Sequence, residues 1–361
     1  MDYRARLVRL QSLLEENRLD ALLVTHLPNI RYLCGFSGSA GALLVTGRRA
    51  LFFSDGRYTV QAKEEVRAAR VVIARKAAVA AAANWMVAHP AASRLRLGIE
   101  GRHLNVETYG WLASTLGSGF RLRPAPPLVE QLRMIKDENE IELIRAAAVL
   151  GASLFQTVLK CIRQRRKETE AAAQMEFAAR KAGAEGMSFP TIVVSGERSA
   201  LPHGKPDDVP IRSDAFVVCD FGVILSGYCS DRTRTVYVGS PTRDARRVYQ
   251  AVQAAQAEAV AAIAPGRTVG EVDRVARKVL QKSGVSRYFT HSTGHGVGLE
   301  IHEAPRLAAG QAEVLQPGMV VTVEPGVYLP GRWGVRIEDM VVVTGQGCDV
   351  LAPSSTDLIA V

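Results

Sequence analysis

The first third of the chain alternates short apolar runs with longer segments in which apolar residues recur every three or four positions. Short runs bounded by glycine or charged residues are typical of strands, and the longer period is typical of amphipathic helices. We predict strands over 20–25, 41–46, 50–54, 71–75 and 95–100, and helices over 4–18, 57–69, 77–89 and 105–116. Strands that alternate with helices in this way predict a small α/β domain.

A proline-rich segment, RPAPPLVE over 123–130, interrupts this pattern and suits an extended linker. Two pairs of helical segments follow, and each pair precedes strands rich in β-branched and aromatic residues; the helices are predicted over 137–162, 167–183, 243–263 and 268–283. The 361 residues also exceed what one hydrophobic core usually serves. We therefore predict an α/β domain over 1–127 and an α+β domain over 128–361.

Two apolar runs in the second domain end in an acidic residue followed by glycine. AFVVCDFG (215–222) places Asp220, and MVVTVEPG (319–326) places Glu324. A second acid, Asp231 or Glu338, follows 11 or 14 positions later on another strand pattern. One such acid alone is most simply explained by an exposed strand end or by pairing with an arginine such as Arg336. Four acids in two matched settings favour a metal site, because buried carboxylates need a partner, and they suggest an internal two-fold repeat.

Four of the seven histidines lie in the second domain. His291, His295 and His302 fall in HSTGHGVGLEIHE (291–303), whose glycines argue against a helix, and His203 lies in a separate loop. The segment lacks the Lys-Ser/Thr of a phosphate-binding loop. Four carboxylates and one neutral imidazole match the charge of two divalent cations, and this ligand set suits Mn²⁺, Co²⁺ or Zn²⁺.

Charge and cysteine content narrow the choice of partners and compartment. The net charge of +9 is spread over many helical segments, so we expect no nucleic-acid partner. No uninterrupted apolar stretch is long enough to predict a transmembrane helix, so we expect no membrane partner. The five scattered cysteines form no CxxC pair, and free thiols in the reducing cytoplasm are the simplest interpretation.

The ordered motifs VCDFG, SDRTRTV, TGHGVGLEIHE, VEPGVY and VRIED resemble the pita-bread (M24) metallopeptidases, which include aminopeptidase P, prolidase and methionine aminopeptidase. The resemblance covers about 130–361. NIRYLCGFSGSAGALLV and FSDGRYTVQAKEEV are similar to the N-terminal domain of bacterial Xaa-Pro peptidases. The resemblance implies a creatinase/prolidase-like α/β N-terminal domain, serving oligomerisation or substrate access, and an α+β pita-bread catalytic domain.

Site residues follow from the same resemblance. It implies two divalent ions, Mn²⁺ first and Co²⁺ or Zn²⁺ as alternatives. Asp220 is expected to bind one ion with both oxygens, Asp231 and Glu338 to bridge the ions, and His295 and Glu324 to be terminal ligands of the second ion. It further implies catalytic roles, with Glu324 as general acid/base, His291 and His302 on the substrate carbonyl, His203 beside the peptide, and Arg336 orienting the acids.

Two residues of SDRTRTV, Arg232 and Thr233, follow the predicted ligand Asp231. Arg232 departs from the family, which more often has an apolar residue there, and it should face away from Asp231. Thr233 shares the face of Asp231, and both a hydroxyl that orients a ligand and an ordinary strand threonine stay open.

The expected activity is metal-dependent cleavage of the bond between an N-terminal residue and a following proline, as in Xaa-Pro aminopeptidases. The alternative is an Xaa-Pro dipeptidase (prolidase), which needs a cation near the substrate's C-terminal carboxylate; Arg48, Arg49 or a residue of a partner subunit are candidates. Methionine aminopeptidase usually lacks the N-terminal domain, and a non-catalytic or creatinase-like member of the fold is the remaining alternative. A proline-containing peptide and a second copy of the chain, as a homodimer, are the expected partners.

Overall fold

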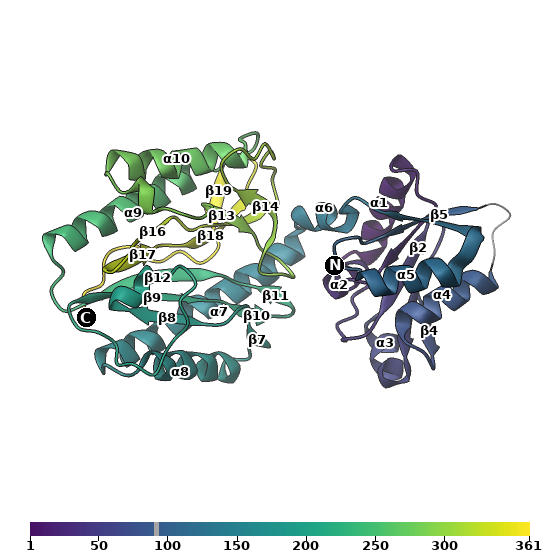
Figure 1. Cartoon of the computed structure of the whole chain (residues 1–361), viewed down its shortest axis with the longest axis horizontal. Helices are drawn as coiled ribbons and strands as arrows, with labels where there is room; N and C mark the ends of the chain where they lie inside the picture. Colours follow the sequence, from purple (N-terminus) through teal and green to yellow (C-terminus); the bar gives the residue numbers. More distant parts are fainter. Residues whose placement is uncertain (90–93) are drawn as a thin grey trace. The chain divides into compact units, whose positions relative to one another are not determined.

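The computed structural model describes residues 1–89 and 94–361 and divides into two compact units, Met1–Arg133 and Met134–Val361 (Figure 1). In the first unit six strands form one sheet in the order β4-β3-β2-β1-β5-β6. These strands are β1 (Ala21–Val24), β2 (Ala42–Thr46), β3 (Ala50–Asp55), β4 (Arg70–Ala74), β5 (Leu95–Ile99) and β6 (Phe120–Pro124). β1 pairs antiparallel with β2 and parallel with β5, so the sheet is mixed.

Helices α4 and α5 pack on one face of this sheet, and α1 contacts β2. The helices of this part of the chain are α1 (Tyr3–Glu16), α2 (Leu27–Cys34), α3 (Thr59–Glu65), α4 (Ala78–Ala88), α5 (Val106–Leu116) and α6 (Leu128–Met134). All four residues of β1 are buried, as expected for a central strand covered on both faces. The α/β class predicted for the N-terminal domain is therefore confirmed.

Two local expectations differ from the structure. The pattern of apolar residues does not predict α2, which has Pro28 in its first turn and ends at Gly35 with φ 87°. The extended chain predicted over 123–130 is wrong in its last part, because Leu128–Met134 forms α6. Pro126 and Pro127 lie just before α6, where a fixed φ favours helix initiation and a missing N–H costs nothing.

The second unit contains four helices and several small sheets. The helices are α7 (Glu138–Arg163), α8 (Glu168–Lys181), α9 (Arg243–Ala261) and α10 (Val269–Lys282). Capping boxes begin α7 at Asp137 and α10 at Thr268, since each side chain accepts from the third helical N–H and a glutamate returns the contact. Among the described residues one helix, α7, is long and apolar enough to cross a membrane by composition; its buried face, however, packs in two core clusters.

The strands of the second unit lie between the α7–α8 pair and the α9–α10 pair (Figure 1). One sheet has the order β12-β9-β8 and another the order β14-β13-β15-β18-β19, and β11-β10-β7 and β16-β17 form smaller sheets. The strands are β7 (Gly186–Met187), β8 (Ile192–Ser195), β9 (Ala215–Phe221), β10 (Val223–Leu225), β11 (Tyr228–Cys229), β12 (Arg232–Val238), β13 (Gly294–Gly296), β14 (Glu303–Leu307), β15 (Val320–Val323), β16 (Gly326–Leu329), β17 (Trp333–Arg336), β18 (Asp339–Val343) and β19 (Cys348–Val350).

Each helix pair packs on its own apolar cluster. Ala147, Leu154 and Met175 of α7 and α8 pack with Val217 and Val236, whereas α9 and α10 pack with residues of β15 to β18. Both faces of β9 and β12 are buried. The α+β class predicted for the second domain is confirmed, and the repeated helix-pair-and-strands arrangement is visible in the packing.

Phe216 of β9 is fully buried and contacts the rings of Tyr237 and Trp333 at 5.1 Å between centroids. We expect Phe216→Ala to lower the free energy of unfolding by about 3–5 kcal/mol, because it removes apolar burial and leaves a cavity. Denaturant titration measures this. The matched variant Phe177→Ala, at a residue 65% exposed on α8, should change the value by less than about 0.5 kcal/mol. Equal effects of the two variants would contradict the assignment of Phe216 to the core.

Candidate metal centre and active site

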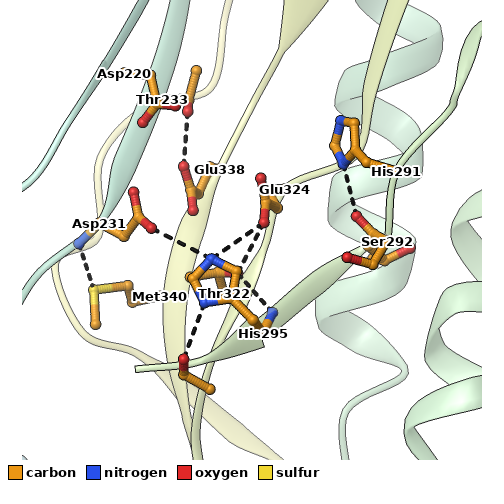
Figure 2. Close-up of polar contacts among 12 residues, drawn as sticks. Asp220, Asp231, Thr233, His291, Ser292, His295, Thr322, Glu324, Glu338 and Met340 are labelled. Atoms are coloured by element: carbon orange, nitrogen blue, oxygen red, sulfur yellow. Dashed lines mark hydrogen bonds and ion pairs between the residues drawn. The ribbon is translucent and has the colours of Figure 1, made fainter. Parts of the chain in front are cut away.

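The five predicted ligands come from two sheets that meet inside the second unit. Asp220 lies near the end of β9, and Asp231 directly precedes β12. His295 lies in the middle of β13, Glu324 directly follows β15, and Glu338 directly precedes β18. Figure 2 shows the side chains of Asp231, His295, Glu324 and Glu338 pointing toward one another from these strands. Residues more than 100 positions apart in sequence therefore share one site.

The ligand atoms are close enough to share cations. His295 Nε2 lies 3.6 Å from Asp231 Oδ2 and 3.5 Å from Glu324 Oε1. Asp231, His295 and Glu338 each offer a ligand atom, and these atoms lie within 4.8 Å of one another. A cavity of about 580 Å³ opens onto the cluster. Its lining includes all nine residues predicted for the site, namely His203, Asp220, Asp231, His291, His295, His302, Glu324, Arg336 and Glu338.

Two buried carboxylate oxygens lack a hydrogen-bond partner among the described residues: Asp220 Oδ1 and Glu338 Oε1. A buried acceptor without a partner is costly, and a bound cation removes that cost. His295 Nδ1 lies 3.0 Å from the Gly296 carbonyl. The ring donates through Nδ1 in this geometry, which leaves the Nε2 lone pair directed at the acids. The donor set fits divalent ions that prefer oxygen and imidazole ligands.

Comparison with known proteins agrees with this geometry. The family model "Metallopeptidase family M24" matches residues 142–345, and "Creatinase/Prolidase N-terminal domain" matches residues 6–135. The chain belongs to metallopeptidase family M24. Its members are enzymes that use divalent metal ions, and the pita-bread fold predicted for the second domain is confirmed by the solved structures of relatives.

Three relatives illustrate the similarity. "Uncharacterized peptidase YqhT" of Bacillus subtilis is 40% identical over 98% of this chain and 99% of its own length. A solved Xaa-Pro dipeptidase from Bacillus anthracis is 39% identical, covers 100% of both chains and superposes with a TM-score of 0.94. A solved X-Pro aminopeptidase from Thermotoga maritima is 35% identical, with 96% of this chain and 99% of that chain covered and a TM-score of 0.85.

Burial and neighbouring charges raise the pKa values of three acids of this M24 site, Asp231, Glu324 and Glu338. Burial raises the pKa of Glu324 to about 8. The pKa values of Asp231 and Glu338 are also raised, first by burial and then by the charges of neighbouring acids, among them Asp220 and Glu324. Burial lowers the pKa of His295 to about 4, so the imidazole is neutral near pH 7. Without cations the cluster therefore holds protons that metal binding would displace.

Arg336 and Thr233 connect the acids to one another. The buried Arg336 guanidinium donates to Asp220 Oδ2, to Thr233 Oγ1 at 3.1 Å and to the Pro202 carbonyl at 3.0 Å. The Thr233 hydroxyl in turn donates to Glu338 Oε2 at 2.7 Å. Of the two interpretations left open for Thr233, the structure supports the hydroxyl that orients a carboxylate. Arg232 faces the other side of the strand, where it donates to the Ala352 carbonyl at 3.0 Å.

Tyr328 joins Arg336 to His291 and was not among the predicted site residues. Its hydroxyl accepts from Arg336 at 2.5 Å and lies 2.9 Å from His291 Nε2. His291 Nδ1 lies 2.8 Å from the Ser292 carbonyl and must donate to it, so Nε2 accepts from Tyr328. Burial lowers the pKa of His291 to about 4, with Arg336 as the next cause. The motif VEPGVY, which places Tyr328 four residues after Glu324, was the available signal.

His203 and His302 are more exposed than the other two histidines of the cavity wall. The His302 ring lies 4.4 Å from the His295 ring, between centroids. Burial lowers the pKa of His302, and the nearby His203 acts in the same direction. Both side chains therefore line the cavity at exposed positions.

The raised carboxyl pKa values predict how metal stabilisation depends on pH. A carboxyl with a raised pKa in the folded state stabilises the metal-free protein at low pH, and this stability is lost as pH rises from about 4.5 to about 8 for Glu324. Divalent ions replace the protons, so the rise in Tm on adding Mn²⁺ to chelator-treated protein should be larger at pH 7.5 than at pH 5.5.

Thermal unfolding at the two pH values, with and without Mn²⁺, measures this difference. Glu338→Gln is the matched variant, since it removes one carboxylate of the cluster, and it should reduce the Mn²⁺-dependent rise in Tm at pH 7.5. An equal rise at both pH values for the unmodified chain would contradict the charge argument.

Proposed function

We propose that this M24 metallopeptidase hydrolyses the peptide bond between an N-terminal residue and a following proline, as an Xaa-Pro aminopeptidase. The observation that carries the proposal is the convergence of five potential ligand side chains in the lining of one cavity, two of them with buried oxygens that have no hydrogen-bond partner among the described residues. The relatives named above as an Xaa-Pro dipeptidase and an X-Pro aminopeptidase support the choice of substrate.

The residues that would hold two divalent ions, Mn²⁺ first, are Asp220, Asp231, His295, Glu324 and Glu338. When bound, such ions polarise the scissile carbonyl and lower the pKa of water. Glu324 is the group proposed to move a proton during the reaction, because its carboxylate lines the cavity beside the other proposed ligands, with Oε1 3.5 Å from His295 Nε2. Arg336 keeps Asp220 in place through their direct contact.

The histidines divide between contact and positioning. His302 and His203 line the cavity in exposed positions and are proposed to bind the substrate carbonyl and the peptide chain. Both ring nitrogens of His291 are already engaged, by Ser292 and by Tyr328. We therefore propose that His291 acts on the substrate by holding the Tyr328 hydroxyl in the cavity wall, rather than by donating to the carbonyl itself.

An Xaa-Pro dipeptidase is the second candidate, and one observation favours it. Lys205 and Arg306 line the same cavity as the acids. A dipeptide leaves its C-terminal carboxylate within the cavity, and a nearby cation is needed to offset the loss of hydration of that charge. These two side chains join Arg48, Arg49 and a residue of a partner subunit as candidates for this contact.

The other assignments made from the sequence extend the proposal. We propose that 128–361 is the catalytic domain and that 1–127 serves oligomerisation and substrate access in a cytoplasmic homodimer. The two arginines at 48 and 49 lie in the turn between β2 and β3, in the first unit.

Glu324→Gln tests the proton-transfer role. We expect this variant to lose at least about 10³-fold in kcat on Ala-Pro substrates, because the amide cannot exchange a proton and is a poorer ligand. The exposed Glu313→Gln should keep kcat within two-fold of the unmodified chain. Circular dichroism confirms that both variants are folded. Activity of Glu324→Gln within ten-fold of the unmodified chain would contradict the role.

Arg306→Gln tests how the cavity selects substrate length. If Arg306 pairs with a product-side carboxylate, the variant should raise KM for Ala-Pro by about 10-fold or more, as expected for loss of a charged hydrogen bond. KM for Ala-Pro-amide, which lacks that charge, should stay within two-fold. Steady-state kinetics measures both. A similar rise for the amide would contradict the pairing.

The same assay compares Ala-Pro with Ala-Pro-Ala for the unmodified chain. Faster turnover of Ala-Pro by ten-fold or more would assign the dipeptidase. Comparable or faster turnover of Ala-Pro-Ala would assign the aminopeptidase.

A further inference from the structure

The metal ligands come from two sheets, so the geometry of the site depends on what joins those sheets. Asp220 belongs to the sheet β12-β9-β8 and Asp231 adjoins it, whereas His295, Glu324 and Glu338 belong to or adjoin the sheet β14-β13-β15-β18-β19. A main-chain hydrogen bond from Glu338 N to the Thr233 carbonyl, at 3.2 Å, links the two sheets directly at a ligand.

Arg234 reinforces this link from the side of β12 that faces away from the cavity. Its Nη1 donates to the carbonyl of Thr233 at 3.0 Å and to the carbonyl of Glu338 at 2.6 Å. One guanidinium nitrogen therefore bridges the two sheets, and it does so at the carbonyl that already accepts from Glu338 N. The planar, fixed fork of arginine makes such a double contact geometrically specific.

Asp339 and Gln256 hold the Arg234 side chain in place. Arg234 Nη2 donates to Asp339 Oδ1 at 2.7 Å, and the Arg234 and Asp339 side chains are 4% and 7% exposed. Gln256 of α9 donates to Asp339 Oδ2 at 3.0 Å. Successive residues of a strand face opposite sides, so Asp339 lies behind the sheet while Glu338 faces the cavity.

We propose that Arg234 and Asp339 form a clamp between the two sheets that positions Glu338 for metal binding. The clamp consists of these two side chains with Gln256, and none of them lines the cavity. Glu338 is then held at three points. Its N–H donates to the Thr233 carbonyl, its carbonyl accepts from Arg234, and its carboxylate accepts from the Thr233 hydroxyl. The inference rests on the proposed metal site and concerns residues that contact neither substrate nor ion.

A purely electrostatic role for Arg234 predicts the opposite result. A buried cation behind a cation site repels metal ions, so removing its charge alone would strengthen metal binding. Positioning instead predicts weaker binding, because residues that orient metal ligands typically contribute about 10–100-fold to metal affinity. The sign of the change therefore separates the two roles.

Arg232 provides a matched control. It lies two residues away on the same face of β12, is similarly buried at 7% exposed, and carries the same charge. Its Nη1 donates to the Ala352 carbonyl and its Nη2 to Ser354 Oγ, which also accepts from Arg234 Nη2 at 3.0 Å. Its ion pair with Asp339 is longer, at 3.8 Å, than the 2.7 Å pair of Arg234. No hydrogen bond of Arg232 reaches Thr233 or Glu338 among the described residues.

The experiment titrates Mn²⁺ by calorimetry into the chelator-treated full chain and its variants, with electron paramagnetic resonance to detect coupled Mn²⁺ pairs. Arg234→Lys keeps the charge but loses the fork, and Arg234→Met/Asp339→Asn removes the pair without leaving an unbalanced acid. We expect both to bind Mn²⁺ at least 10-fold more weakly, with a smaller fraction of coupled pairs, while their circular dichroism is unchanged. Arg232→Met should stay within two-fold of the unmodified chain.

The outcomes are distinguishable. If the unmodified chain binds no Mn²⁺, the proposed function itself fails. If it binds Mn²⁺ but both Arg234 variants match it within two-fold, or if Arg232→Met weakens binding as much as they do, the clamp is overturned. If neither Arg234 variant folds, Asp339→Asn decides: a loss of affinity of three-fold or more supports the clamp, and unchanged affinity overturns it.

Discussion

The repulsion among four buried carboxylates is the constraint around which the second unit is organised. Asp220, Asp231, Glu324 and Glu338 line one cavity, and burial together with their mutual repulsion disfavours the fully ionised state. The protein offsets this only in part, with the Arg336 guanidinium and the Thr233 hydroxyl. Asp220 Oδ1 and Glu338 Oε1 have no hydrogen-bond partner among the described residues, and bound cations would remove the cost of burying them.

Hydrophobic burial holds these acids together in the absence of cations. The strands β9 and β15, which lead to Asp220 and Glu324, are mostly apolar and buried on both faces, with Val217 and Val218 before Asp220 and Val320 and Val321 before Glu324. Each fully buried valine contributes roughly 1.5–3 kcal/mol, so a few such residues offset a repulsion of several kcal/mol. The stability of the apolar layers is thus what allows an electrostatically unfavourable site to be preformed.

The five side chains proposed as ligands line one cavity, and each carries a local signal in the sequence. Asp220 and Glu324 end apolar runs, Asp231 and Glu338 follow them by 11 and 14 positions, and His295 lies in a glycine-rich segment. The order of these motifs therefore singled the five residues out without knowledge of tertiary contacts. The contacts between sheets carried no such signal. The pairing of Arg234 with Asp339, and that of Tyr328 with His291, depends on how separate strands pack, which spacing within one strand does not encode. The short helix α2 was missed for a different reason, since eight residues with a proline give little periodicity.

The chain is similar to both a dipeptidase and an aminopeptidase, and the difference between the metal-binding residues and the rest of the cavity wall bears on this double similarity. In the proposed function the metal ligands carry out bond cleavage, and two enzymes that cleave the same bond need the same ligands. In the proposed function, substrate length is selected at the cavity wall, where Arg306 is the cation proposed to stabilise a product-side carboxylate. A charged hydrogen bond contributes about 1.5–3 kcal/mol, which corresponds to a preference of about 10- to 100-fold. An effect of this size is large enough to separate a dipeptidase from an aminopeptidase, and Arg306 lies outside the motifs that identify the family.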